Sequence, residues 1–174
     1  MYKVKTNFYY ELCVRHDYEY LRYTYDDKQF EGNFWGLKLF LGEFKPERPI
    51  ILQDDSEFGN SYSDIVPTDL HIYYVISNKL AQALADEEIK GFSTFPVTTP
   101  PGTGDYVGIS IHGRINATTG KPLDAIQLES TVNDSDIMLV KEGSLTIGRT
   151  IINEKVFSVL SKFQLPNVEF NLTK

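Results

Sequence analysis

The chain has 174 residues and carries a net charge of -7 at neutral pH. Nucleic acids and anionic membranes attract positively charged surfaces, so this charge argues against a general binder of either. Hydrophobic residues make up 41% and aromatic residues 13% of the chain, as in folded globular proteins. No apolar run approaches the roughly 20 residues that cross a bilayer, and the first residues lack the apolar core of a signal peptide. We therefore expect a cytoplasmic protein.

The first third of the chain, residues 1–53, is rich in tyrosine and predicts a subdomain of antiparallel strands. Four strand-like stretches follow one another, at residues 7–14, 18–25, 33–44 and 48–53. Their aromatic side chains would pack as cross-strand pairs. The alternative is that residues 7–44 form a platform on which tyrosines and Trp35 stack against a carbohydrate or peptide, since tyrosine offers both area and a hydroxyl.

Residues 54–71 form an acidic, polar connection without clear periodicity. We expect them to join the first subdomain to an α+β subdomain at residues 72–174, the whole forming one compact unit. No Lys or Arg occurs between Arg48 and Lys79. The acids of this interval either keep the surface soluble or form a face that meets a basic partner. On the second hypothesis the candidate partner contacts are Asp54, Asp55, Glu57 and Asp64, with Tyr62 as an aromatic anchor.

A second interval without positive charge lies between Lys121 and Lys141. Its acids are Asp124, Glu129, Asp134 and Asp136. The same two interpretations apply to it.

Two stretches, residues 77–97 and 153–172, each predict a capped helix, a turn and a strand. Ser77 and Asn153 are suitable N-caps, and apolar residues recur behind both at helical spacing. Gly91 would turn the chain after the first helix and Asn167 after the second, because Gly and Asn best tolerate a left-handed backbone. With the strand-like segments between them, these units predict an α+β fold with a mainly antiparallel sheet.

No motif in the sequence favours catalysis, a cofactor or a metal. The glycines of residues 99–108 match neither a phosphate loop nor a dinucleotide fingerprint, and Asp105 would repel phosphate. The three histidines lack the spacing of zinc ligands, and although His71 or His112 could be a general base, neither has a recognisable nucleophile partner. Cys13, the one cysteine, lies in a strand-like run typical of a buried apolar residue. We therefore expect a protein that is not an enzyme.

Residues 69–97 and 136–172 resemble a family of small bacterial immunity proteins, the neutralising partners of polymorphic or contact-delivered toxins. The resemblance rests on core and turn positions of both helix–strand units. They are Asp69, Ser77, Lys79, Leu84, Gly91, Phe95, Pro96, Tyr106, Lys155, Leu160 and Phe170. Asn153, where the family often has Ser, and Pro166-Asn167 in the last turn depart from the pattern.

The resemblance implies a non-catalytic protein that binds a cognate toxin and occludes it. An acidic face would dock over a basic cleft, such as that of a nuclease, where charge speeds encounter and buried aromatics hold the complex. The carbohydrate- or peptide-binding platform is the alternative. An enzyme of unrecognised type is a third possibility, which a deep cleft with strongly perturbed ionisable groups would favour.

Overall fold

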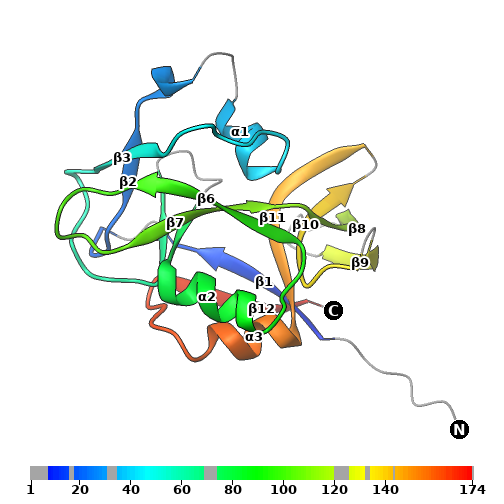
Figure 1. The fold of residues 1–174 in the computed structure, drawn as a ribbon. Coiled ribbons are helices and arrows are strands. Elements are labelled where there is room, and N and C mark those ends of the chain that lie inside the picture. Colours follow the sequence, from blue (N-terminus) through cyan, green and yellow to red (C-terminus); the bar gives the residue numbers. More distant parts are fainter. Residues whose placement is uncertain are drawn as a thin grey trace, which may run out of the picture.

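The computed structural model describes most of the chain and builds it mainly from strands. The described residues are 8–15, 18–30, 35–68, 74–119, 126–131, 134–142 and 144–173. Their strands form two six-stranded sheets, and two helices lie side by side along one side of the molecule (Figure 1). The predicted α+β class, with its mainly antiparallel pairing, is confirmed.

The first sheet has the order β12-β1-β11-β10-β8-β9. All of its neighbouring strands are antiparallel except β8 and β10, which run parallel. The strands are β1 (Tyr9–Val14), β8 (Gly113–Thr119), β9 (Ile126–Thr131), β10 (Ile137–Glu142), β11 (Leu145–Asn153) and β12 (Val168–Thr173).

The second sheet has the order β2-β3-β6-β7-β5-β4. Here only β3 and β6 are parallel neighbours. The strands are β2 (Tyr23–Tyr25), β3 (Ile50–Asp54), β4 (Ile65–Pro67), β5 (Tyr74–Ser77), β6 (Phe92–Thr98) and β7 (Tyr106–Ile111).

Two capped helices connect strands within these sheets, as the sequence predicts. α2 (Asn78–Asp86) begins after Ser77, whose hydroxyl accepts a hydrogen bond from the Leu80 amide at 3.2 Å. α3 (Glu154–Leu160) begins after Asn153, whose side-chain oxygen accepts from the Val156 amide at 3.1 Å. Each cap satisfies an N–H group that the first helical turn leaves without a partner. Each helix then leads into a strand, β6 and β12 respectively, so both predicted helix–strand units are confirmed.

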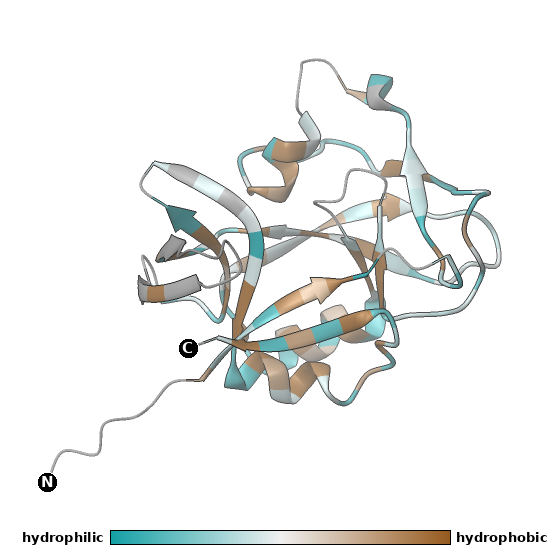
Figure 2. Cartoon of the chain, turned by 180° about the vertical axis from the view of Figure 1, so that it is seen from behind, coloured by the Kyte–Doolittle hydropathy of each residue, from teal (hydrophilic) through white to brown (hydrophobic). Residues whose placement is uncertain are grey.

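The main core lies between the two sheets and the two helices. Leu80 and Leu84 form the apolar stripe of α2, and Val156 and Leu160 form that of α3. All four belong to one buried cluster with strand residues of both sheets. Hydropathy colouring shows the hydrophobic residues of these helices (Figure 2). Since apolar surface from both units is buried in one cluster, hydrophobic burial holds the sheets together.

One predicted strand is a helix. Residues 35–40, inside the predicted strand 33–44, form α1 (Trp35–Phe40). Trp35, Leu39 and Phe40 are buried on one side of it, at helical i, i+4 and i+5 spacing, while Leu37 is partly exposed. The short run is nearly all apolar, so its sequence alone does not separate a helix from a strand.

The predicted division at residues 54–71 does not follow the sheets. β1, from the first segment, pairs with β11 and β12 near the C-terminus, whereas β2 and β3 belong to the other sheet. Residues 54–71 also contain β4, which pairs with β5. The tyrosine-rich first third is therefore shared between two sheets.

The turn after α3 also differs from the prediction. Gly91 has a φ of +98°, as expected, but Glu88 is the one non-glycine residue with positive φ in the described ranges, so Asn167 is not left-handed. The segment between α2 and β6 is residues 87–91. The segment between α3 and β12, residues 161–167, is longer and contains Pro166. Asn167 is instead buried, and its side-chain amide donates to the carbonyl of Ile65 at 3.0 Å.

Candidate functional site

The acidic connection forms a loop that packs against residues 18–22. The amide of Gly59 donates to the carbonyl of Tyr18 at 2.8 Å, and the Tyr18 and Phe58 rings stack at 4.9 Å. A Cβ atom on Gly59 would lie 2.4 Å from the Glu19 carbonyl oxygen, so the close approach of these two backbones requires glycine. We call the exposed side of residues 54–62 together with Tyr18 and Glu19 the loop surface.

Two predicted acidic contacts, Asp54 and Glu57, are exposed on the loop surface. Asp55 is only partly exposed, and its carboxylate lies 3.5 Å from Nε of Arg22. The Arg22 guanidinium also lies over the Phe58 ring, 4.6 Å from its centroid. Arg22 thus ties the acid and the aromatic residue of the loop to β2, and the loop surface is held in one shape.

Tyr62, the predicted anchor, is 37% exposed at one end of the loop. Its hydroxyl donates to Oδ1 of Asp64 at 2.7 Å, and Nζ of Lys79 lies 5.0 Å from its ring centroid. These contacts hold the ring in place while leaving part of it open to solvent. A fixed, partly exposed tyrosine suits a protein interface, because little side-chain entropy remains to be lost on binding.

Asp64 does not lie on the surface, so it is not a candidate partner contact. Its side chain is 0% exposed. Oδ1 accepts hydrogen bonds from the Ser77 hydroxyl at 2.5 Å and from Tyr62, and Nζ of Lys79 lies 3.2 Å away. Oδ2 accepts from the backbone amide of Gln164 at 2.9 Å. Asp64 therefore joins the start of α2 to the segment that follows α3.

The pKa of Asp64 is lowered below its ordinary value. Burial alone would raise the pKa of this carboxyl, because a low dielectric disfavours the charged form. The hydrogen bonds from Ser77, Tyr62, the Gln164 amide and Lys79 outweigh burial, since all of them stabilise the carboxylate. Asp64 is thus a buried, fully bonded anion at neutral pH, with a structural role.

The described acids of the second interval, Asp134 and Asp136, are both bonded to other residues of the chain. Asp134 is paired with Nζ of Lys90 at 2.7 Å, and this ion pair is largely exposed. Asp136 accepts hydrogen bonds from the Lys90 amide and from the side-chain amide of Asn153. Asp124 and the side chain of Glu129 lie outside the described residues.

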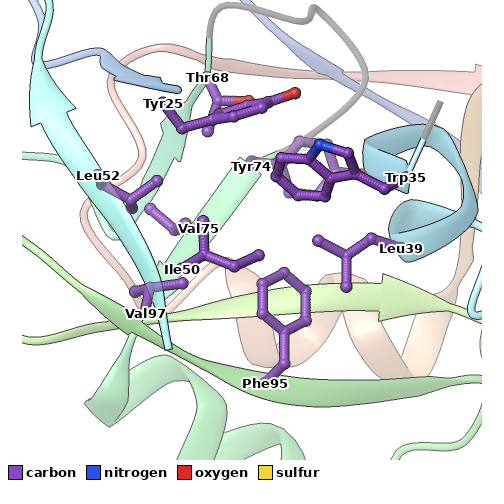
Figure 3. A pocket seen from close by; sticks show the side chains of 10 residues that line it. All are labelled: Tyr25, Trp35, Leu39, Ile50, Leu52, Thr68, Tyr74, Val75, Phe95 and Val97. Carbon is purple, nitrogen blue, oxygen red and sulfur yellow. The ribbon is translucent and has the colours of Figure 1, made fainter. Parts of the chain in front are cut away.

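Two of the cavities are small apolar voids inside the cores. One, with a volume of about 20 Å³, lies between α1 and the strands β3, β5 and β6 (Figure 3). Trp35, Leu39, Ile50 and Phe95 line it. The other, also of about 20 Å³, lies in the main core beneath α2 and α3. Their linings are packing surfaces of the two hydrophobic clusters.

A third cavity, of about 190 Å³, is a cleft with both polar and apolar walls between the turn after α1 and the strands β6 and β7. Nε2 of His112 shares a hydrogen bond with the hydroxyl of Ser93 at 2.7 Å. Burial, and then the charge of Arg114, lower the pKa of His112, so its ring is neutral at pH 7. Sequence inspection missed this pair because Ser93 and His112 meet only through strand pairing.

The aromatic residues of the first third mostly pack inward. Trp35 is 5% exposed and Tyr23 is fully buried. Tyr10 stacks on Phe157 of α3 with ring centroids 4.3 Å apart. Among the described tyrosines of residues 7–44, Tyr18 is the one whose side chain is largely exposed, at 70%. The predicted stacking platform of residues 7–44 thus loses Trp35 and has no single sheet to carry it.

The described residues contain no group of three or more His, Cys, Asp or Glu side chains placed to hold a metal ion. Cys13 is half-buried, and burial, followed by the charge of Glu11, raises the pKa of its thiol. A thiol with a raised pKa is a poor nucleophile at neutral pH. In the same ranges, no helix is both long and apolar enough to cross a membrane.

Comparisons with known proteins add no relative. No model of a known protein family matches the chain, and no curated protein matches it.

Proposed function

We propose that the protein is a non-catalytic immunity protein that binds a bacterial toxin and neutralises it by occluding it. The proposal rests on the resemblance of both helix–strand units to immunity proteins and on the loop surface. In this proposal the protein lies in the cytoplasm, and its partner is a basic protein. The loop surface carries the partner contacts in this proposal.

The observation that carries the proposal is that the loop surface presents acidic and aromatic side chains together on a loop that is held in one shape. Asp54 and Glu57 are exposed on the same loop as Phe58, whose ring stacks on Tyr18, while Arg22 and the backbone hydrogen bonds of Gly59 and Ser61 hold the loop. Aromatic side chains are enriched at the centres of protein interfaces, and complementary charge accelerates association. A held loop loses little conformational freedom on binding, which favours affinity.

Occlusion requires no chemistry from this chain. A toxin with a basic catalytic cleft would be covered by an acidic, rigid surface, and its substrate would be excluded by steric overlap and by charge. The contacts at the edge of such an interface are sensitive to salt because ions screen exposed charges over about 10 Å at 0.1 M ionic strength.

The test starts from capture of partners from the host lysate by the tagged protein, followed by purification of the captured protein. Binding is then measured at low and high salt for the wild type and for Asp54→Lys/Glu57→Lys. Glu47→Lys/Glu87→Lys is the matched control, since both glutamates are exposed outside the loop surface. We expect the loop variant to bind at least about tenfold more weakly, a change of about 1.4 kcal/mol, and the control to bind like the wild type.

Neutralisation is measured separately. The captured partner is expressed in cells with the wild type, the loop variant or the control, and growth is followed. We expect protection by the wild type and the control only. A partner that does not harm cells when expressed alone, or one that harms them despite bound wild-type protein, would reject the immunity function. Equal binding by the loop variant would reject the loop surface as the contact.

A further inference from the structure

The two helix–strand units are parts of two larger units that share one order of strands. β4, β5, α2, β6 and β7 follow one another in the chain, and their strands lie in the order β6-β7-β5-β4. In the other sheet, β10, β11, α3 and β12 follow one another, and β1 supplies the missing strand, giving the order β12-β1-β11-β10. All neighbouring pairs in both sets are antiparallel.

The strand registers agree as well as the order. Ile65 pairs with Ile76 in one unit and Ile137 with Ile152 in the other. Ser77, the cap of α2, pairs with Tyr106, and Asn153, the cap of α3, pairs with Tyr9. Phe92 pairs with Ile111, and Val168 with Val14. One alignment of the two units therefore satisfies the pairs that the three ladders share, and the register shift of β10 against β11 lies beyond Leu139, outside these pairs.

The same alignment superimposes side-chain contacts. The sequence Ser-Asp-Ile leads into both first strands, at residues 63–65 and 135–137, with the isoleucine as the first residue of the strand. His112 bonds to Ser93 across β7 and β6, and at the equivalent positions beside β1 and β12 Arg15 forms an ion pair with Glu169. The amide of His112 donates to the Gly91 carbonyl at 2.7 Å, as that of Arg15 does to the Asn167 carbonyl at 2.8 Å.

The aspartate of each motif makes the same bonds within its own unit. The Asp64 carbonyl accepts from the Ser77 amide at 2.9 Å, and Oδ1 accepts from the Ser77 hydroxyl. The Asp136 carbonyl accepts from the Asn153 amide at 3.1 Å, and Oδ1 accepts from the Asn153 side-chain amide at 2.6 Å. Each aspartate thus fixes the N-cap of its own helix.

Each aspartate also holds the segment that follows the helix of the other unit. Asp64 donates its amide to the Gln164 carbonyl and accepts the Gln164 amide at Oδ2, both at 2.9 Å. Asp136 donates its amide to the Lys90 carbonyl at 3.0 Å and accepts the Lys90 amide at Oδ2 at 2.8 Å. The contact is made in both directions, as between the subunits of a symmetric dimer, but Gln164 is equivalent to Glu88 in the alignment above, so the two latched segments are two residues out of register.

From these agreements we infer that the chain is an internal duplication of a strand–strand–helix–strand–strand unit, whose two copies close each other through a reciprocal pair of aspartate latches. An approximate two-fold axis relates the copies. Tyr74 and Thr150, which occupy equivalent positions beside the caps, meet each other by a hydrogen bond of 2.7 Å. The device couples the halves, because releasing either aspartate frees a helix start in one copy and a helix exit in the other.

The coupling is tested by amide hydrogen exchange resolved by residue. Asp64→Asn should accelerate exchange at the Gln164 amide about tenfold or more, and Asp136→Asn should do the same at the Lys90 amide, because in each case the acceptor lies in the opposite copy. Asp54→Asn, at an exposed acid, should change neither amide. Unchanged protection of Gln164 and Lys90 in folded variants would overturn the reciprocal latch.

The equivalence of the copies is tested by exchanging their caps, which covers the case in which the aspartate variants do not fold. In Ser77→Asn/Asn153→Ser each copy receives the cap of the other. We expect its urea midpoint to stay close to that of the wild type, whereas Ser77→Ala/Asn153→Ala should lower the midpoint clearly. If the exchanged caps cost as much as the two alanines, the sites are not equivalent and the duplication is rejected.

Discussion

Asp64 and Gln164 lie far apart in the chain and exchange two hydrogen bonds of 2.9 Å, one in each direction. Because the Asp64 carboxylate is buried, no water replaces the Gln164 amide if the pair opens slightly. The contact therefore contributes more to the stability of the fold than an ion pair on the surface does.

Asp64→Ala should destabilise the protein by about 3 kcal/mol. The substitution removes the acceptor for Ser77, Tyr62 and the Gln164 amide together, and a broken buried network typically costs this much. Urea unfolding followed by circular dichroism measures the loss. Asp54→Ala, at an exposed acid of the same loop, should change stability by less than about 0.5 kcal/mol. Similar losses in both variants would mean that burial of Asp64 is not what matters.

The pH dependence of stability should contain a contribution from Asp64. Its pKa in the folded protein is lowered, so this stabilisation is complete above the ordinary carboxyl pKa of about 3.9 and is lost as the pH falls through the lower, folded value. Stability of the wild type should thus fall between about pH 4 and the acid limit of folding. Asp64→Asn should be less stable at pH 7 and should lose less on acidification; parallel pH profiles would contradict this assignment.

Gly91→Ala should be strongly destabilising. Gly91 has a φ of +98°, and an added Cβ would lie 2.2 Å from the carbonyl oxygen of Ile137. Gly102 is the matched control, because its φ of +85° imposes similar backbone strain while nothing lies within 4 Å of the position that a Cβ would take. We expect Gly102→Ala to cost about 1 kcal/mol and Gly91→Ala clearly more. Equal midpoints in thermal unfolding would show that the collision is relieved by a small shift.

Phe58→Ala should loosen the loop surface without unfolding the protein. The ring stacks on Tyr18 and lies under the Arg22 guanidinium, and both contacts are lost with it. Such contacts contribute about 0.5–1.5 kcal/mol each. We expect faster limited proteolysis near residue 58 with a small change in global stability. Phe58→Tyr, which keeps the ring, is the control and should resist proteolysis like the wild type.

The sequence predicts the two caps and both helix–strand units because their signals are local. Ser77 and Asn153 are followed by apolar residues at helical spacing, and Gly91 stands where the chain must turn. The helix at Trp35–Phe40 escapes prediction because its apolar run is too short for a period to show. Its fold is decided by tertiary burial of Trp35, Leu39 and Phe40, not by pattern.

The candidate site is predictable only in part. Asp54 and Glu57 are exposed as expected, but Asp64, another aspartate of the same acidic interval, is buried. Charge counting along a chain does not show which acid will find four donors in the folded state, since those of Asp64 come from Tyr62, Ser77, Lys79 and Gln164. The repeated Ser-Asp-Ile sequence is the signal that would have predicted a structural role for both Asp64 and Asp136.

β1 is synthesised early, but the strands with which it pairs are synthesised late. Its neighbours, β11 and β12, come from the last part of the chain, and Leu12 within it is buried in the main core. On a ribosome, this strand stays with its apolar face and hydrogen-bonding edges uncovered until β11 and β12 have emerged. Long-range pairing of this kind slows folding. The second copy therefore cannot be completed before β12 has emerged, and until then the nascent chain needs protection from aggregation.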